Sequence, residues 1–378
     1  MTTLCNYRVL IYVMLLVSGF FMNLGVLATA FFCSIFIVAI FINNLRVGKR
    51  SIYALSLWLI YAISVISVYL SSDQDLDEKL TIANLVYSFL AVLMISILSS
   101  EKRKYIEKAL YYSILLLLSI LIIQHLTYVI TFKYLDVHNF ITLGKYFSRY
   151  ESNYLAQFGL LRPTGLSVEP SNFSAVLVYM IFSFAWLRGS LDNKVIVLLF
   201  LSSLTLSFAS MGIIAAILSV IVMARVIDKK RVFDLVIAST VLLLATIAVL
   251  ILIDRITSGV DYDALGSRLK IVKYYYDVDY LNVLWGHGLF FFENVVTFNS
   301  VELSNSNIRD SGVWISIFFA AGVPGLILLG IIVVSVKWPL FSLAVAIGLC
   351  SKLDFMQPSF WVLISILICF DSVRRGHV

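Results

Sequence analysis

The chain has 378 residues, of which 61% are hydrophobic and 13% are charged, and its formal net charge is +6. A mean hydropathy of +0.98 excludes a soluble globular domain, and the continuous apolar runs exclude a membrane β-barrel, whose strands alternate in polarity. In such a chain the excess of Lys and Arg indicates topology and not nucleic-acid binding. We predict an all-α, polytopic helical membrane protein, with residues 1–378 forming a single integral membrane domain.

About twelve transmembrane helices account for the apolar runs, because each such helix needs about 20 apolar residues. The run at 9–42 is too long for one helix, and residues 23–25 divide it into two short spans. Inside the span at 312–336, Pro324 predicts a kink, because proline removes a helix hydrogen bond. The predicted spans are two within 9–42, then 51–70, 81–99, 109–131, 170–187, two within 195–226 divided at 207–212, and then 233–253, 312–336, 339–350 and 358–370.

The distribution of cations predicts the orientation of these spans. Twelve spans place both termini on one side, and the basic clusters between spans fall on that same side. Lys and Arg are enriched in cytoplasmic loops, so we expect both termini in the cytoplasm. Two long loops, residues 132–169 and 254–311, then face outward, and loops of this length between membrane spans are often functional.

A polar stretch, residues 162–171, closes the first long loop and begins the next span. Arg162 is a permanent cation whose guanidinium suits phosphate. Glu169 directly precedes Pro170, which is a favoured first residue of a helix. The carboxylate of Glu169 is therefore expected at the positive end of a helix dipole, a few residues from an anion-binding cation.

The second long loop offers a similar arrangement. Four apolar residues at helical spacing predict an amphipathic helix over 265–276, with Arg268 at the edge of the apolar face, where the helix can lie on the membrane. A glycine turn that contains His287 follows. Arg309 and Asp310 come just before the next span, so that Asp310 mirrors Glu169.

Taken together, these motifs resemble the O-antigen polymerases of the Wzy type, within the O-antigen polymerase and ligase superfamily. The resemblance is carried by the two long outer loops, the Arg-x-x-Gly…Glu-Pro-Ser stretch that leads into a helix, the Gly-x-Gly turn in the second loop, and the acidic residue before a Gly-Val-Pro-Gly helix. The layout covers about the whole chain. Ligases of this plan carry a histidine before the helix that follows the second loop, whereas this chain has Asp310, which favours a polymerase.

The resemblance implies glycosyl transfer without a metal or another cofactor at the outer face of the bacterial inner membrane. A glycan on undecaprenyl pyrophosphate is transferred to the next lipid-linked repeat unit, and arginines of the two outer loops bind the pyrophosphate. These positions map to Arg162 and Arg268, with Arg309 as a further candidate for substrate binding. The partners expected are the undecaprenyl-pyrophosphate-linked oligosaccharide, membrane lipid and a chain-length regulator protein.

This chemistry fits the residue types. Fixed cations in a dry site stabilise a pyrophosphate leaving group, and the acceptor hydroxyl needs a proton acceptor. Glu169 and Asp310 are the candidate bases, and His287 is a further candidate catalytic residue.

Structural alternatives remain for each residue. Arg162 and Glu169 can form a salt bridge within the loop, Glu169 and Asp310 can cap helices, and Arg268 can anchor a helix to lipid phosphates. His287 can be a simple loop residue. Gln124 and His125, near the outer end of the fifth span, can serve in a hydrogen bond between helices.

Alternative functions remain as well. An O-antigen ligase or a polymerase of capsule or exopolysaccharide would use the same scaffold. A flippase for the lipid-linked glycan is the rival from another class, although transporters concentrate charges within their spans and carry internal repeats.

Overall fold

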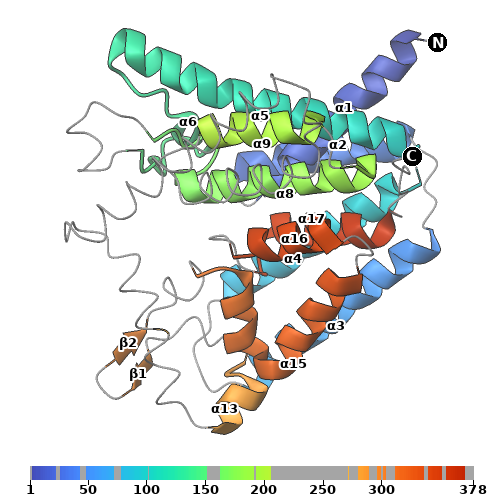
Figure 1. Ribbon diagram of the computed structural model, residues 1–378, viewed down its shortest axis with the longest axis vertical. Coiled ribbons are helices and arrows are strands. Elements are labelled where there is room, and N and C mark those ends of the chain that lie inside the picture. Colours follow the sequence, from blue (N-terminus) through green and yellow to red (C-terminus); the bar gives the residue numbers. More distant parts are fainter. Residues whose placement is uncertain are drawn as a thin grey trace, which may run out of the picture.

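The structure is a computed structural model. It describes residues 2–22, 26–42, 48–71, 78–100, 102–150, 162–190, 193–205, 271, 280–288, 296–298, 301–303, 311–335, 339–350 and 355–370. These residues are mainly helical (Figure 1). The strands among them form a short antiparallel hairpin of β1 (Val296–Phe298) and β2 (Val301–Leu303), in which Val296 pairs with Leu303.

The helices follow the predicted spans closely. The run at 9–42 is divided as expected, because one helix ends at Phe20 and the next begins at Val26. The helices of the first part are α1 (Thr2–Phe20), α2 (Val26–Ile42), α3 (Lys49–Ser71), α4 (Glu78–Leu98), α5 (Arg103–Thr131) and the short α6 (Val137–Ile141). Those of the second part are α8 (Pro170–Arg188), α9 (Asn193–Thr205), α13 (Tyr280–Trp285), α15 (Val313–Ser335), α16 (Pro339–Gly348) and α17 (Pro358–Cys369).

Within the described residues, four helices are long and apolar enough to cross a membrane, namely α3, α5, α8 and α15. Shorter apolar helices accompany them. The predicted class, a helical protein with membrane-spanning segments, is therefore confirmed at this coarser level. The predicted span at 233–253 and the second one within 195–226 lie outside the described residues, and the number twelve stays a prediction.

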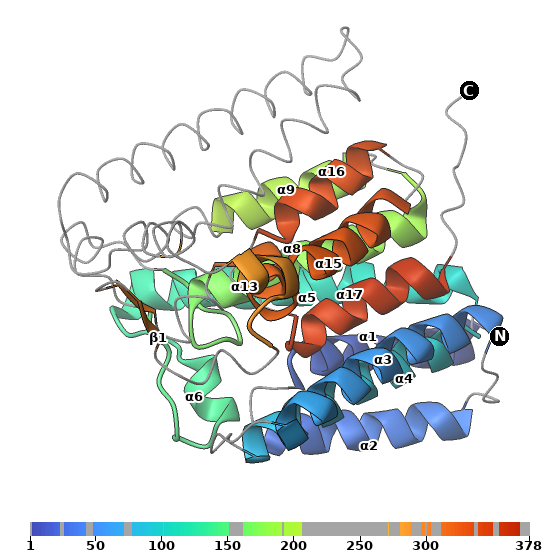
Figure 2. The same cartoon turned by 90° about the horizontal axis from the view of Figure 1, so that it is seen from below.

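Helix α8 lies at the centre of the bundle. Ninety-four per cent of its apolar window is buried inside the protein, as expected of a helix that is apolar on all sides. Figure 2 shows α8 surrounded by α5, α9, α16 and α17, and α8 contacts each of these four helices. Because α8 begins directly after the polar stretch, the centre of the bundle positions that stretch.

Polar contacts join three helices at the other end of α8. The guanidinium of Arg103, at the start of α5, donates hydrogen bonds to the backbone carbonyls of Trp186 and Leu187. The indole of Trp186 donates to the carbonyl of Phe370, 2.8 Å away, and thereby holds the end of α17. Arg188 forms an ion pair of 3.0 Å with Glu107 of α5. The hydrogen bonds of Arg103 and Trp186 supply donors to carbonyls at the ends of α8 and α17, where a helix runs out of intrahelical donors.

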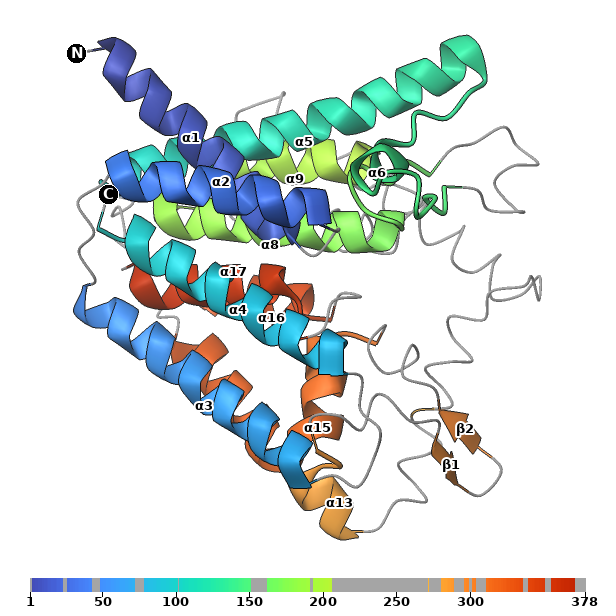
Figure 3. The same cartoon turned by 180° about the vertical axis from the view of Figure 1, so that it is seen from behind.

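The bundle therefore has two distinct ends. The starts of α1, α3 and α5 and the ends of α2, α4 and α8 lie at the right of Figure 1 and at the left of Figure 3. The start of α8, α6, α13 and the β-hairpin lie at the opposite end. This alternation is the one expected of helices that cross a membrane in turn, and we call the second of these two ends the loop end.

Candidate functional site

The polar stretch meets α8 in the way the sequence predicts. Glu169 is the last residue before the helix, with an extended backbone at φ −126° and ψ 145°, and Pro170 occupies the first turn. The side chain of Glu169 makes no capping hydrogen bond with α8. Glu169 thus occupies the N-cap position of α8, as the cap alternative expected, but its carboxylate does not bond to the backbone N–H groups of the first turn.

The partner of Glu169 is a cation that sequence reasoning did not single out. The guanidinium Nη1 of Arg149 lies 2.8 Å from Oε1 of Glu169, and the hydroxyl of Ser171 lies 3.4 Å from Oε2. The backbone N–H of Arg149 also donates to the carbonyl of Val168, 2.7 Å away. The side chain of Arg149 is 75% exposed and that of Glu169 is 19% exposed, so a polar ligand can reach the guanidinium of the pair.

A tight turn precedes this ion pair. The N–H of Ser167 donates to the carbonyl of Thr164 at 3.0 Å, and the intervening Gly165 has φ +58°. Glycine adopts this conformation without a steric penalty, as at the first central position of a type II′ turn. A Cβ atom on Gly165 would also lie 2.2 Å from the ring of Phe173. The turn is thus pressed against the first turns of α8.

Three side chains from α5 and the following loop hold the backbone of this turn. The carboxamide of Gln124 accepts from the N–H of Gly165 at 2.9 Å and donates to its carbonyl at 3.2 Å. The hydroxyl of Tyr134 accepts from the N–H of Thr164 at 3.0 Å. Nδ1 of His138 donates to the carbonyl of Leu166 at 3.0 Å, and the carbonyl requires that this nitrogen carry the hydrogen. We call these three side chains the turn clamp.

Burial influences the chemistry of Tyr134. Its ring stacks on that of Tyr150, with centroids 4.0 Å apart, and its hydroxyl also bonds to the hydroxyl of Thr164 at 2.7 Å. Desolvation by burial raises the pKa of Tyr134 above its usual value of 10.0, against the opposing effect of the hydrogen bonds with Thr164. The phenol is therefore neutral over the physiological range and serves as a structural hydrogen-bonding group.

Asp136 closes the loop that contains α6. One carboxylate oxygen accepts from the N–H of Asn139 and the other from the N–H of Ser148, each at 2.9 Å. These two bonds cap α6 and bring its far side back beside its start. Arg149 directly follows Ser148, so this closure also directs Arg149 toward Glu169.

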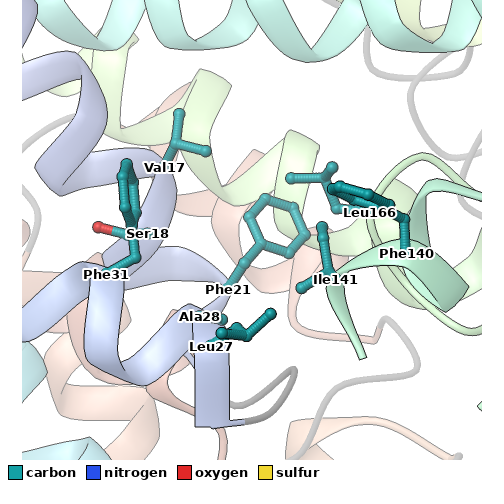
Figure 4. Close-up of a pocket in the computed structure, with 9 residues that line it drawn as sticks. All are labelled: Val17, Ser18, Phe21, Leu27, Ala28, Phe31, Phe140, Ile141 and Leu166. Atoms are coloured by element: carbon teal, nitrogen blue, oxygen red, sulfur yellow. The ribbon is translucent and has the colours of Figure 1, made fainter. Parts of the chain in front are cut away.

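An apolar cavity adjoins the turn. Its volume is about 300 Å³, and its wall combines the end of α1, the start of α2, α6 and Leu166 of the turn. Figure 4 shows Phe31 on one side and Phe140 and Leu166 on the other, with Phe21 between them. The cavity continues the apolar packing beneath the turn, where Phe21 stacks on Phe173 with centroids 5.6 Å apart.

The glycine turn of the second loop has a different role from that expected. The N–H groups of His287 and Gly288 donate to the carbonyls of Phe319 and Ala320, at 2.7 and 3.1 Å. Helix α15 is broken at Gly322, whose φ is 57° and ψ is −149°. Because Pro324 has no N–H, it cannot serve the carbonyl of Ala320. The kink predicted from Pro324 is confirmed, and the glycine turn supplies the donors that the broken helix lacks.

His287 lies against α15 and not beside Glu169. Its ring stacks on that of Phe319, with centroids 5.6 Å apart, and burial lowers its pKa below the usual 6.5. Helix α13, which leads into the turn, and the start of α8 are both at the loop end, but α13 lies well below the start of α8 in Figures 1 and 3. The structure does not bring His287 together with the polar stretch.

The remaining predicted residues divide into two groups. Arg162 is half-buried where the chain approaches the turn. Arg268, Arg309 and Asp310 lie outside the described residues, as does the predicted helix at 265–276 except for Ile271, which is helical and buried. Gln124 bonds to the backbone of the first loop, and these bonds differ from the predicted contact between helices.

Comparisons of the chain with protein-family models, with curated proteins and with solved structures found no match.

The site therefore combines the exposed cation Arg149 with the carboxylate of Glu169, and Arg162 lies in the same polar stretch of the sequence. Among the described residues, no group of three or more His, Cys, Asp or Glu side chains is placed to hold a metal ion. Arg149 and Arg162 suit an anion of the phosphate type, because guanidinium groups bind phosphate oxygens with two parallel hydrogen bonds. The carboxylate of Glu169 can accept a proton from a hydroxyl group that lies at hydrogen-bond distance.

Proposed function

We propose that the chain polymerises undecaprenyl-pyrophosphate-linked oligosaccharide repeat units into O-antigen polysaccharide at the outer face of a bacterial inner membrane. The observation that carries the proposal is the ion pair of Arg149 with Glu169 at the start of the central helix α8, with Arg162 in the same stretch. The resemblance of the loop motifs to the O-antigen polymerases supplies the reaction type. The enzyme is a glycosyltransferase that needs no metal.

In the proposed reaction, a hydroxyl of the acceptor repeat unit attacks the anomeric carbon of the donor glycan. A glycosidic C–O bond forms, the bond from that carbon to the pyrophosphate oxygen breaks, and undecaprenyl pyrophosphate leaves. The hydroxyl proton passes to a carboxylate, for which Glu169 is our first candidate and Asp310 the second. Guanidinium groups stabilise the charge on the leaving group, and Arg162 and Arg268 are assigned this role by the resemblance.

Arg149 joins this set because of its geometry. It is exposed, and its guanidinium is held by the carboxylate of Glu169. A pyrophosphate that binds Arg149 competes with Glu169 for that guanidinium, and the released carboxylate can then accept the hydroxyl proton. Binding of the donor and activation of the acceptor are thereby coupled through one ion pair.

The proposal also includes the topology. Twelve spans place both termini in the cytoplasm and both long loops outside, so that the loop end of the bundle faces the lipid-linked substrate. Arg309 and His287 are retained as further candidates for substrate binding and catalysis. Membrane lipid and a chain-length regulator protein are the partners in this arrangement.

The test is the surface-glycan ladder of a strain that lacks the protein and is complemented with wild type or with single variants at matched membrane levels. We expect Arg149→Ala, Arg162→Ala and Glu169→Gln to leave lipid core plus one repeat unit and no ladder. Lys145→Ala is the matched control, because it removes an exposed cation of the same loop, and its ladder should be that of wild type.

Other outcomes identify the rivals. Loss of the single repeat unit as well as the ladder indicates a ligase or a flippase. A wild-type ladder in all three variants would show that these three residues are not part of the catalytic site. If the deletion strain and the wild type form the same ladder, the proposed function is refuted.

A further inference from the structure

The carboxamide of Gln124 is fully engaged although it lies in a membrane-type helix. Its side chain has 0% exposure. The oxygen accepts from the N–H of Gly165, and the nitrogen donates to the carbonyls of Gly165 and Leu135, at 3.2 and 3.1 Å. The two hydrogens of an amide nitrogen are thus both used. A buried amide costs free energy unless it is bonded in this way, so its position is well determined.

Both polar groups of Gly165 are held by this single side chain. Gly165 is the residue of the turn with positive φ, and because glycine is free to adopt other backbone states, the two bonds select this one. Arg162 precedes it by three residues and Glu169 follows it by four. The conformation at Gly165 therefore determines how the segment with Arg162 and the segment with Glu169 are oriented relative to each other.

We propose that Gln124 is a positioning residue for the polar stretch: its carboxamide fixes the Gly165 turn so that Arg162 and Glu169 meet the same substrate. The inference rests on the proposed function, because it assigns a role within that reaction. Gln124 itself does not contact the substrate. Its contribution requires one donor and one acceptor at the same place, which makes it testable by a variant with nearly the same shape.

Gln124→Glu is that variant. A neutral carboxylic acid offers one acceptor to the N–H of Gly165 and one O–H donor to its carbonyl, and so reproduces the pair of bonds. The ionised carboxylate has no donor and would face the carbonyls of Gly165 and Leu135. Burial disfavours the charged carboxylate, so a larger share of the variant carries the neutral acid as the pH falls. The ladder formed by this variant should increase as the pH of the medium falls from 8.0 to 5.5.

We expect the ratio of ladder intensity between Gln124→Glu and wild type to rise about tenfold or more over this range, because a lost bond to a charged group has an effect of that order. Gln124→Met, which can neither donate nor accept at this position, should form little ladder at either pH. Lys145→Ala should show the ratio of wild type throughout. All variants are compared at matched membrane levels.

The thermal unfolding temperature of the purified full-length variants in detergent gives an independent readout. Gln124→Glu should unfold below wild type at pH 8.0, and this gap should narrow at pH 5.5. If the difference in unfolding temperature narrows while the ladder ratio does not change with pH, the positioning role is overturned and the bonds of Gln124 are purely structural. If neither quantity changes with pH, the bonds between Gln124 and Gly165 are themselves refuted. Failure of wild type to restore any ladder instead removes the proposed function, and the unfolding data still test the clamp.

Discussion

Arg149 and Glu169 are joined by an ion pair of 2.8 Å between a largely exposed guanidinium and a largely covered carboxylate. The pair connects the end of the first loop's α6 segment to the start of α8. Pairs with one exposed partner contribute little to folding, about 0–1 kcal/mol. The pair therefore adds little to the stability of the fold, while its guanidinium stays open to a polar ligand.

Arg149→Ala should therefore lower the free energy of unfolding by less than about 1 kcal/mol while abolishing the glycan ladder. The matched control is Arg188→Ala at the opposite end of the bundle. The Arg188 and Glu107 side chains are only 18% and 15% exposed, so this change should cost roughly 1–3 kcal/mol. Denaturant unfolding in detergent and the ladder assay measure the two effects. The reverse pattern, a large stability loss for Arg149→Ala with an intact ladder, contradicts the assignment.

Gly165→Ala should destabilise the protein for two separate reasons. A positive φ costs a residue with a side chain about 1–3 kcal/mol, and the added Cβ would collide with the ring of Phe173. Replacing Phe173 with Ala removes the collision but not the backbone cost. The double variant should therefore be less destabilised than the sum of the two single changes, as measured by a double-mutant cycle of unfolding free energies. Simple additivity would show that the ring is not in contact with this turn.

Tyr134 predicts a change of stability in alkaline solution. Burial raises its pKa in the folded protein, so above the ordinary tyrosine pKa the unfolded chain loses its proton first. The stability contributed by the neutral phenol is complete below about pH 10 and is lost as the pH rises through the higher folded value. Wild type should lose stability over this window more steeply than Tyr134→Phe. Parallel slopes in chemical unfolding experiments at pH 9 and 11 would refute the assignment.

His287 predicts the opposite window. Burial lowers its pKa in the folded protein, so in acid the unfolded chain takes up the proton first. The stability contributed by the neutral ring is complete above pH 6.5 and is lost as the pH falls through the lower folded value. Wild type should lose more stability than His287→Gln between pH 7.5 and 5.0, measured by thermal unfolding. An equal loss in both proteins would show that the ring is accessible to protons when folded.

Much of the helical plan could be predicted from the sequence, because continuous apolar runs and their polar interruptions mark the helix ends directly. The division between Phe20 and Val26 and the start of α8 at Pro170 are examples. The break in α15 was predicted at Pro324, whereas the non-helical residue is Gly322. Its position depends on where the glycine turn docks, and no local pattern shows that.

The contacts of the site were less predictable. The partner of Glu169 depends on the path of the loop between Arg149 and α8, and the sequence does not show which of several loop cations approaches the carboxylate. Gln124 was recognised as a polar residue in an apolar helix, but its partner is a backbone turn 41 residues away. The signal that could have identified this partner is the glycine. A glycine in a polar stretch marks a turn, and a buried amide side chain can bond to the backbone N–H and C=O groups of such a turn.

The break in α15 also makes this helix depend on the segment that precedes it. In hydrocarbon every backbone carbonyl needs a donor, and an unsatisfied one costs several kcal/mol. The carbonyls of Phe319 and Ala320 obtain their donors from the glycine turn at His287 and Gly288. The glycine turn and α15 are therefore one structural unit, because α15 without the turn would lack the donors that these two carbonyls use.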